Sequence, residues 1–313
     1  KIMAKKISVL IPTYNEEDNV IQICEAVKEE FEKKLSGYDY EIVFIDNCSK
    51  DRTREKLIKL CGDDNRVKAI FNAKNFGAFK SPFYGMLQTT GDCVIMLCAD
   101  FQDPVDMIPK FVKEWESGYR IVIGIKTASK ENKFMYFLRS KYYEFIKKYS
   151  DVEQIEHFTG FGLYDTKFID VLKKLDDPMP YLRGIVAELG FERKEIEYVQ
   201  ALRKAGKTST NWYRLYDAAM LGITSYTKIG LRLATITGFV ISIFNFIVGI
   251  GYLIAKLIFW DSFPMGSAPI LIGIFFIGAA QMLFIGLMGE YILNINTRVM
   301  KRPLVVEEKR LNF

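Results

Sequence analysis

The polar segment at residues 98–104, with the sequence CADFQDP, contains side chains that could bind a metal ion. Asp100, Gln102 and Asp103 place two carboxylates and a carboxamide within four residues. Such oxygen ligands suit a Mg²⁺ or Mn²⁺ ion that bridges a diphosphate. A capped turn before a helix that begins at Pro104 is the simpler alternative, but it accounts for Asp103 only. The segment therefore predicts a metal site with Asp100 and Gln102 as ligands.

Two further polar segments come directly after apolar runs that predict strands. Residues 12–17, PTYNEE, follow the first run, and residues 46–49, DNCS, follow the second. Each has a purely structural explanation, because acidic residues favour the first turn of a helix and an aspartate can cap a helix. An aspartate at such a position can equally hydrogen-bond a base or a ribose. Taken singly, neither segment decides between the two uses.

These polar segments need a scaffold, and the first 125 residues supply one by alternating strand and helix patterns. Apolar runs predict strands, and apolar residues at helical spacing predict helices between them. The predicted strands are 7–11, 40–45, 67–71, 93–97 and 121–125, and the predicted helices are 16–35, 52–61 and 79–89. This alternation indicates an α/β fold with a largely parallel sheet and helices on both faces. Ligands bind beyond the carboxyl ends of such strands, where the polar segments fall.

The pattern becomes less regular after Lys126. Residues 134–149 predict an amphipathic helix rich in basic and aromatic side chains, and residues 155–164 predict a glycine-rich loop and strand. Residues 188–201 include a strand-like stretch that leads into a basic loop. Residues 212–229 mix aromatic, basic and apolar side chains, which predicts interfacial helices lying on a bilayer. An ordinary surface helix is the alternative for that last stretch.

The chain contains two long stretches without charged residues, at 233–255 and 262–289. They separate an apolar zone from the charged, soluble zone that precedes it. Half of the 313 residues are hydrophobic, yet 26% are charged. Each stretch is long enough to cross a hydrocarbon layer about 30 Å thick as a helix. A buried helical hairpin in a soluble core is the alternative. We expect two transmembrane helices.

The basic residues predict how these spans are oriented. Lys228 and Arg232 flank the first span and Arg298 follows the second, with further basic residues after it. The positive-inside rule then places both ends of the chain in the cytoplasm. No signal peptide is evident at the start, and the odd number of cysteines without metal-ligand spacing indicates free thiols in a reducing compartment. No basic, aromatic-studded strand or groove-reading helix indicates nucleic-acid binding.

Taken together, the motifs resemble family 2 glycosyltransferases, and more narrowly the polyprenyl-phosphate branch with dolichol-phosphate mannose synthase and bacterial bactoprenol-phosphate glucosyltransferases. The family pattern is P-T-Y-N-E, D-D-G-S, R-N-x-G and D-A-D-L-Q-D-P. The corresponding segments here are 12–16, 46–49, 74–77 and 98–104. Their order and spacing make the resemblance specific, and it extends over the two predicted spans.

The resemblance implies a GT-A catalytic domain and a membrane anchor. The expected divisions are a cytoplasmic GT-A domain at 1–210, juxtamembrane interfacial helices at 211–229, two transmembrane helices at 230–293 and a cytoplasmic tail at 294–313. It also implies a bacterial inner-membrane protein that forms homo-oligomers, with tetramers known among relatives.

The resemblance assigns residues to three tasks. Residues expected to bind the nucleotide are Pro12, Tyr14, Glu16, Asp46, Asn75, Ala99, Asp100, Arg203 and Lys207. Residues expected to act in catalysis are Asp100, Gln102, Glu156, Arg139 and Lys126. Among these, Lys126 and Arg139 would bind the lipid phosphate. Arg203 would close a loop over the nucleotide, because a guanidinium binds phosphate oxygens in pairs. As surface cations, all of these basic residues would need no special role.

Three departures from the family pattern affect the expected chemistry. Cys98 replaces the first aspartate of the metal motif, and a thiol is a poor Mg²⁺ ligand. Asn47 replaces the second aspartate of D-D-G-S. Glu156 or His157 lies nearest to where relatives carry an aspartate. The absence of a catalytic base would not prevent transfer, because the acceptor is a phosphate monoester, which is largely dianionic at pH 7 and is already a nucleophile.

The sequence therefore predicts an inverting transfer of a hexose from a nucleotide sugar to undecaprenyl or another polyprenyl phosphate, for glycosylation of the cell envelope. UDP-glucose is the leading donor by analogy, but the sugar cannot be inferred from the sequence. One alternative is a family 2 transferase that acts on a glycan or a protein, although no Q-x-x-R-W motif of processive synthases is present. A non-catalytic membrane scaffold is the other alternative, and Cys98 favours it.

Overall fold

The structure is a computed structural model of the chain, and it describes most of the 313 residues. The described residues are 5–128, 155–201, 216, 219–221, 223–225, 227, 229–258 and 267–313.

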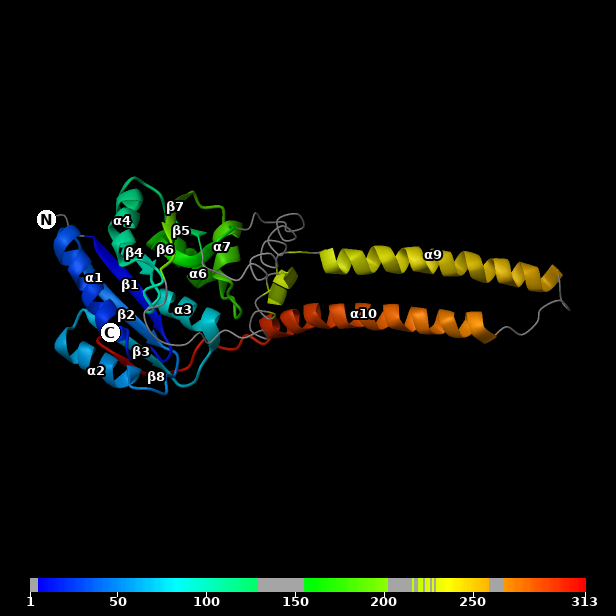
Figure 1. The fold of residues 1–313 in the computed structure, drawn as a ribbon, viewed down its shortest axis with the longest axis horizontal. Coiled ribbons are helices and arrows are strands. Elements are labelled where there is room, and N and C mark those ends of the chain that lie inside the picture. Colours follow the sequence, from blue (N-terminus) through cyan, green and yellow to red (C-terminus); the bar gives the residue numbers. More distant parts are fainter. Residues whose placement is uncertain are drawn as a thin grey trace.

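A single eight-stranded sheet forms the core of the globular part of the molecule (Figure 1), in the order β7-β5-β6-β4-β1-β2-β3-β8. The strands are β1 Lys6–Thr13, β2 Asp39–Asp46, β3 Val67–Asn72, β4 Cys93–Met96, β5 Ile121–Ala128, β6 Phe158–Asp165, β7 Arg193–Val199 and β8 Glu307–Leu311. The pairs β1–β2, β1–β4, β2–β3 and β5–β7 are parallel. Strand β6 runs antiparallel to both β4 and β5, and β8 runs antiparallel to β3. The predicted α/β architecture with a mostly parallel sheet is confirmed.

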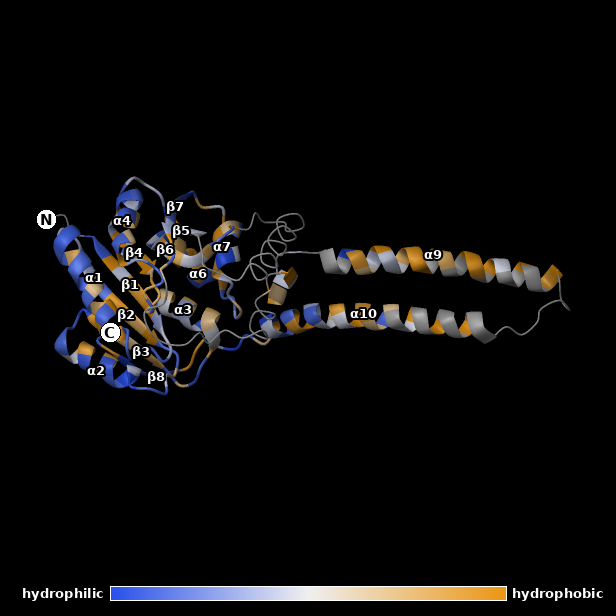
Figure 2. Ribbon diagram, in the orientation of Figure 1, coloured by the Kyte–Doolittle hydropathy of each residue, from blue (hydrophilic) through white to orange (hydrophobic). Residues whose placement is uncertain are grey.

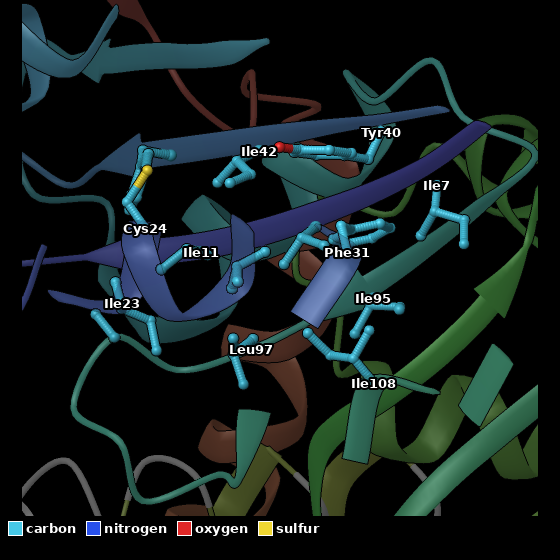
Figure 3. Packing of buried hydrophobic residues seen from close by; sticks show 14 of the residues in the cluster. Ile7, Ile11, Ile23, Cys24, Phe31, Tyr40, Ile42, Ile95, Leu97 and Ile108 are labelled. Carbon is cyan, nitrogen blue, oxygen red and sulfur yellow. The ribbon is translucent and has the colours of Figure 1, made fainter. Parts of the chain in front are cut away.

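Helices cover both faces of this sheet. They are α1 Val20–Lys34, α2 Thr53–Asp63, α3 Gly77–Leu87, the 3-10 turn η1 Val105–Met107, α4 Ile108–Glu116, α6 Thr166–Leu175 and α7 Leu182–Glu188. Helices α1, α2 and α4 pack with one buried cluster, whereas α3, α6 and α7 pack with the other. Figure 3 shows part of the first cluster, including Ile7 and Ile11 of β1 with Phe31 of α1. Leu10 belongs to the second cluster, because successive strand residues face opposite sides of a sheet.

Several element boundaries differ from those predicted. Helix α1 begins at Val20 rather than residue 16, since residues 16–19 form a turn in which the Asn19 N–H donates to the Glu16 carbonyl at 3.0 Å. The helix start at Pro104, on which the alternative interpretation of residues 98–104 depends, is not observed. Pro104 is extended, and the regular helix begins at Ile108 after the 3-10 turn.

The C-terminal residues contribute a strand that the sequence did not predict. Strand β8 pairs with the outer edge of β3, with Leu311 opposite Ala69. The Asn312 side-chain amide then donates to the backbone carbonyls of Cys61 and Val67, at 2.7 and 2.8 Å. The stretch expected to be a tail therefore belongs to the central sheet, which covers the edge of β3 and satisfies its backbone groups.

Two long helices, α9 Ile229–Ile258 and α10 Ser267–Val299, lie alongside each other and extend away from the sheet (Figure 1). Many of their described residues are apolar (Figure 2), and side chains such as Phe239 and Leu283 are exposed. Within the described part of the chain, no helix is long and apolar enough to cross a membrane. The two spans predicted from the sequence are therefore not confirmed. Half of residues 212–229, where interfacial helices are predicted, lie outside the described residues.

Candidate functional site

The loop after β1 is held in place by the loop after β2. The two strands end side by side, with Thr13 opposite Asp46. Asn15 has a φ of 56°, in the left-handed region that asparagine tolerates better than most residues. Its backbone N–H donates to Ser49 Oγ at 2.8 Å, and its side-chain oxygen accepts from the Lys50 N–H at 2.8 Å. Nearby Glu16 is fixed in the same way, because its N–H donates to Thr53 Oγ1 at 2.9 Å. The two loops form one unit.

Three predicted nucleotide-binding residues lie on this unit. Pro12, Tyr14 and Glu16 are half-buried at the carboxyl edge of β1. The Glu16 carboxylate accepts from Asn19 Nδ2 at 2.6 Å, which orients one of its oxygens. The predicted juxtaposition of the first two polar segments is therefore present.

Asp46, at the end of β2, is fully buried and its carboxylate is engaged within the protein. It accepts hydrogen bonds from the Ser49 backbone N–H, from the Ser49 hydroxyl and from Arg54 Nε, the last at 2.7 Å. The same guanidinium donates to the Asn72 carbonyl at 2.6 Å and to Glu308 at 2.7 Å. Asp46 thus ties together β2, α2 and β3, while its contact with a base or ribose stays a prediction.

Asn47 occupies a position where its amide is used as both donor and acceptor. Its Oδ1 accepts from the Phe76 N–H at 2.8 Å, and its Nδ2 donates to Asn75 Oδ1 and to the Gly77 carbonyl, both at 3.1 Å. A carboxylate could accept the first bond but could not donate the other two. The amide in place of the family's second aspartate therefore fixes the loop that carries the exposed Asn75.

The segment after β4 divides into a structural carboxylate and a candidate ligand. Asp103 is buried and accepts from the Tyr198 hydroxyl at 2.9 Å and from the Cys98 N–H at 3.4 Å. Burial raises the pKa of the Asp103 carboxyl, against the lowering effect of the Tyr198 hydrogen bond. Asp103 therefore does not cap a helix, as the alternative interpretation of this segment required, because its carboxylate accepts from Cys98 and Tyr198.

Asp100 lies in the same turn, with only 6% of its surface exposed. One carboxylate oxygen accepts from the Gln102 N–H at 3.1 Å, while the Gln102 carbonyl accepts from Ala201 N–H at 3.3 Å. Phe101 between them has a φ of 60°. The turn is thus anchored to the end of β7, and Ala99 is buried beneath it.

Cys98 has solvent-exposed surface. Desolvation of its thiol nevertheless raises the pKa well above the usual range, and the nearby carboxylates of Asp103, Asp100 and Glu16 add to the shift. Strands β1 and β4 are parallel neighbours, so the loops that follow them leave the same edge of the sheet.

The oxygen donors of this region suit a divalent cation that is also held by a phosphorylated ligand. Among the described residues, no three His, Cys, Asp or Glu side chains gather closely enough to hold a metal ion. Asp100 and Gln102 nevertheless supply oxygen donors in one turn. Mg²⁺ is commonly held by one or two carboxylates plus substrate phosphates and water. The donor set therefore suits a metal that arrives with a diphosphate.

The remaining predicted residues fall into two groups. Lys126, Glu156 and His157 meet at the edge where β5 ends and β6 begins, with the Lys126 N–H donating to the His157 carbonyl at 3.3 Å. His157 has a φ of 57°, and Glu156 is exposed. Arg139, Arg203 and Lys207 lie outside the described residues.

Two residues that organise the site were missed in the sequence. Arg54 had no signal beyond being a basic residue on a helix, and Tyr198 looked like an ordinary strand aromatic. Tyr198 lies 95 residues from its partner Asp103 in the chain. Asp46, the partner of Arg54, lies in a segment that also suits a helix cap, so nothing in the sequence indicated an ion pair.

Comparison with known proteins gives a consistent result. The family described as Glycosyl transferase family 2 matches residues 8–190. The chain is 32% identical to an Escherichia coli K12 prophage bactoprenol glucosyl transferase homolog, over 95% of this chain and 97% of that protein. It is 31% identical to an SfII prophage-derived bactoprenol glucosyl transferase of Shigella flexneri, over 97% and 98% of the two chains. A putative glycosyltransferase of Bacillus subtilis, CsbB, is 33% identical over 95% and 89%.

Proposed function

The chain belongs to glycosyltransferase family 2, and from this premise we propose that it transfers a hexose from a nucleotide sugar to a polyprenyl phosphate. One observation carries the proposal. The relatives named bactoprenol glucosyl transferase match 95–97% of this chain, so the likeness extends beyond residues 8–190 and includes the long helices.

The donor is proposed to bind at the carboxyl edge of the sheet, with UDP-glucose as the preferred nucleotide sugar. Pro12, Tyr14 and Glu16 would line one side, and Asn75, held by Asn47, would reach it from the loop after β3. The parallel pairing of β1 to β4, and through β2 to β3, brings the loops after these strands to one edge and supports this placement. Arg203 and Lys207 would close over the nucleotide, as the family resemblance implies.

The proposed reaction is a direct displacement at the anomeric carbon. An oxygen of the acceptor phosphate forms the new bond to that carbon, and the bond from carbon to the nucleotide diphosphate breaks, with inversion of configuration. The acceptor needs no base, because a phosphate monoester is largely dianionic at pH 7. Lys126 and Arg139 would hold this phosphate near the donor, which makes alignment the main contribution of the protein.

Asp100 and Gln102 are proposed to hold Mg²⁺ or Mn²⁺. When bound, such an ion neutralises charge that develops on the departing diphosphate. Glu156 lies at the same edge of the sheet as Lys126 and would act on the acceptor side. Cys98 replaces a carboxylate of the family's metal motif, which leaves Asp100 as the charged ligand in this turn.

We further propose that the chain is a multi-pass protein of the bacterial inner membrane, with its catalytic domain in the cytoplasm. The proposal is supported by the uncharged stretches at 233–255 and 262–289 and by exposed apolar side chains on both long helices. Basic residues beside the predicted spans favour this orientation. A homo-oligomer, such as a tetramer, stays a prediction.

The test is an incubation of the full-length protein with Mn²⁺, labelled UDP-glucose and undecaprenyl phosphate, followed by partition into organic solvent. The account predicts a labelled lipid. A labelled water-soluble polymer would favour a glycan-modifying transferase, and absence of nucleotide-sugar turnover would favour a scaffold. Other UDP-hexoses and GDP-mannose, tested in parallel, identify the donor.

Matched variants make this assay specific for the proposed metal ligand. Asp100→Asn should abolish transfer without loss of the fold, whereas Asp106→Asn should retain transfer. Asp106 is exposed in the neighbouring 3-10 turn and pairs only with Lys110, at 3.5 Å, among the contacts described. Removal of divalent ions with a chelator should stop the reaction, and added Mn²⁺ should restore it. Full turnover in Asp100→Asn would refute the metal assignment.

A further inference from the structure

A shallow cavity of about 400 Å³ lies between the loop after β3 and the segment that follows α10. We call it the β3–α10 cavity, and its lining residues are Ala73, Lys74, Phe76, Arg302, Pro303 and Val306. The Ala73 N–H donates to the Val306 carbonyl at 2.9 Å, so the two sides are joined by a backbone hydrogen bond. The loop after β3 therefore forms one wall of the cavity, and the segment after α10 forms the other.

Positive charge gathers at this cavity without matching negative charge. Lys74 and Arg302 line it, and both lie close enough to Lys80 to repel its charge. Within the described part of the chain, none of these three cations forms a salt bridge, and the nearby Asp177 pairs instead with Arg298 at 3.0 Å. Partial burial lowers the pKa of the Lys80 ammonium, and the two neighbouring cations lower it further.

The position of Lys80 adds to this imbalance. Lys80 lies in the first turn of α3, which contains no acidic residue. The first turn of a helix carries partial positive charge, so a cation is disfavoured there by several tenths of a kcal/mol. Three unpaired cations placed together are costly in the absence of an anion, and a bound anion would offset that cost.

The rest of the cavity lining is apolar. Ala73, Phe76, Pro303 and Val306 contribute carbon surface, and the Lys74 ammonium lies 5.1 Å from the centre of the Phe76 ring. A free inorganic anion would leave this surface unused. A ligand with an anionic head and an adjoining hydrocarbon chain would use both parts.

The cavity also lies close to the end of α10. That helix ends at Val299, and Arg302 and Pro303 follow within four residues. If α10 crosses a membrane as proposed, this end meets the cytoplasmic headgroup layer. The other wall, the loop after β3, is fixed by Asn47 and continues to Asn75 of the candidate nucleotide site.

We propose that the β3–α10 cavity binds the phosphate headgroup of a lipid, with the phosphate at the lining cations Lys74 and Arg302, in the field of Lys80, and the first carbons of the chain on the apolar lining. The identification of the ligand as a lipid rests on the proposed function. Two lipids share this chemistry, and the experiment separates them: an anionic phospholipid, and the polyprenyl phosphate acceptor held at a site separate from its reacting position at Lys126 and Arg139.

The test measures occupancy at the cavity itself, without any sugar donor. In the full-length protein in uncharged detergent, Ala73→Cys introduces a thiol on the cavity wall, and mass spectrometry of its peptide reports the rate of maleimide labelling. Geranyl phosphate should slow this labelling. Geraniol, which lacks the phosphate, and inorganic phosphate, which lacks the chain, should protect much less.

Charge variants decide which residues provide the protection. In Ala73→Cys with Lys80→Gln and Arg302→Gln, half-protection should require at least about tenfold more geranyl phosphate, because charge-assisted hydrogen bonds are lost. The control with Lys59→Gln and Lys110→Gln loses the same charge at exposed sites on α2 and α4 and should match the parent. Equal protection in the cavity variant, or equal protection by inorganic phosphate, would overturn the proposal.

A phospholipid arm identifies the source of the headgroup. Phosphatidylglycerol that protects position 73 as well as geranyl phosphate does would support the site with a phospholipid as its occupant. Selective protection by geranyl phosphate would support the acceptor lipid. A protein that shows this protection but transfers no sugar would refute the proposed function and leave the cavity assignment intact.

Discussion

Arg54→Met should destabilise the fold strongly, because it removes the partner of a fully buried carboxylate. Asp46 has no exposed surface, and Arg54 Nε lies 2.7 Å from its Oδ2. Removal of one member of a buried ion pair typically costs 3–5 kcal/mol. The Arg54 side chain is 25% exposed, so water can partly replace it, and we expect the lower end of that range, about 3 kcal/mol.

The expected loss is large enough to measure as a shift in thermal midpoint. For a domain of this size, 1 kcal/mol corresponds to roughly 2–4 °C, so the midpoint should fall by about 6–12 °C. Three buried thiols, Cys24, Cys61 and Cys93, provide the readout, because a thiol-reactive fluorophore labels them only as the fold opens. The assay works in detergent with the full-length protein.

Three comparisons isolate the buried pair from other effects. Arg52→Met removes an exposed arginine near the start of the same helix and should change the midpoint little. Glu308→Gln removes the outer partner of Arg54. The Glu308 side chain is 56% exposed, so its loss should lower the midpoint much less than Arg54→Met does. Asp46→Asn combined with Arg54→Met should regain part of the loss. An Arg54→Met midpoint equal to that of the parent would refute the reasoning.

Three other residues give sharp expectations. Hydrogen bonds from Lys6, Ser8, Lys68 and the Thr90 N–H overcome the burial of Glu41, which alone would raise its pKa, and hold that pKa at about 2 against a usual 4.5. A depressed pKa stabilises the fold above pH 4.5, and this contribution, about 3 kcal/mol, is lost as pH falls towards 2. Thermal midpoints across that pH window should therefore converge for the parent and Glu41→Gln, and a constant difference would contradict this. Gly162→Ala should destabilise the β5–β6 pair by about 1–3 kcal/mol, since its Cβ would lie 2.5 Å from the Val122 carbonyl oxygen; an unchanged midpoint would be the contrary result. Tyr198→Phe should lower the rate of transfer in protein that remains folded, because the Asp103 carboxylate loses a donor at 2.9 Å beside the turn that carries Asp100. An unchanged rate would argue against this anchoring.

The parts of the fold that were predictable have local signatures. The first five strands are short apolar runs, and the buried spacing of Val20, Ile23, Val27 and Phe31 was visible as a helical pattern. Because parallel strands carry their following loops to one edge, the meeting of the loops after β1 and β2 also followed from the sequence.

The parts that were not predictable depend on contacts between distant residues. Strand β8 has the sequence EEKRL, which has no apolar alternation, and it is held by the edge of β3. Arg54 belongs to the site because Asp46 and Glu308 converge on it, over 254 residues in the second case. The use of Asn47 as a donor depends on Asn75 and Gly77, and no local pattern reveals that geometry.

The most direct test of the account follows the acceptor phosphorus during the reaction of the purified full-length protein with a nucleotide hexose. In ³¹P NMR, the account predicts that the phosphomonoester signal of undecaprenyl phosphate is replaced by that of a phosphodiester carrying one β-linked hexose, while nucleoside diphosphate accumulates in equal amount. A monoester signal that stays unchanged with every nucleotide sugar, under conditions where the protein remains folded and supplied with Mn²⁺, would contradict it.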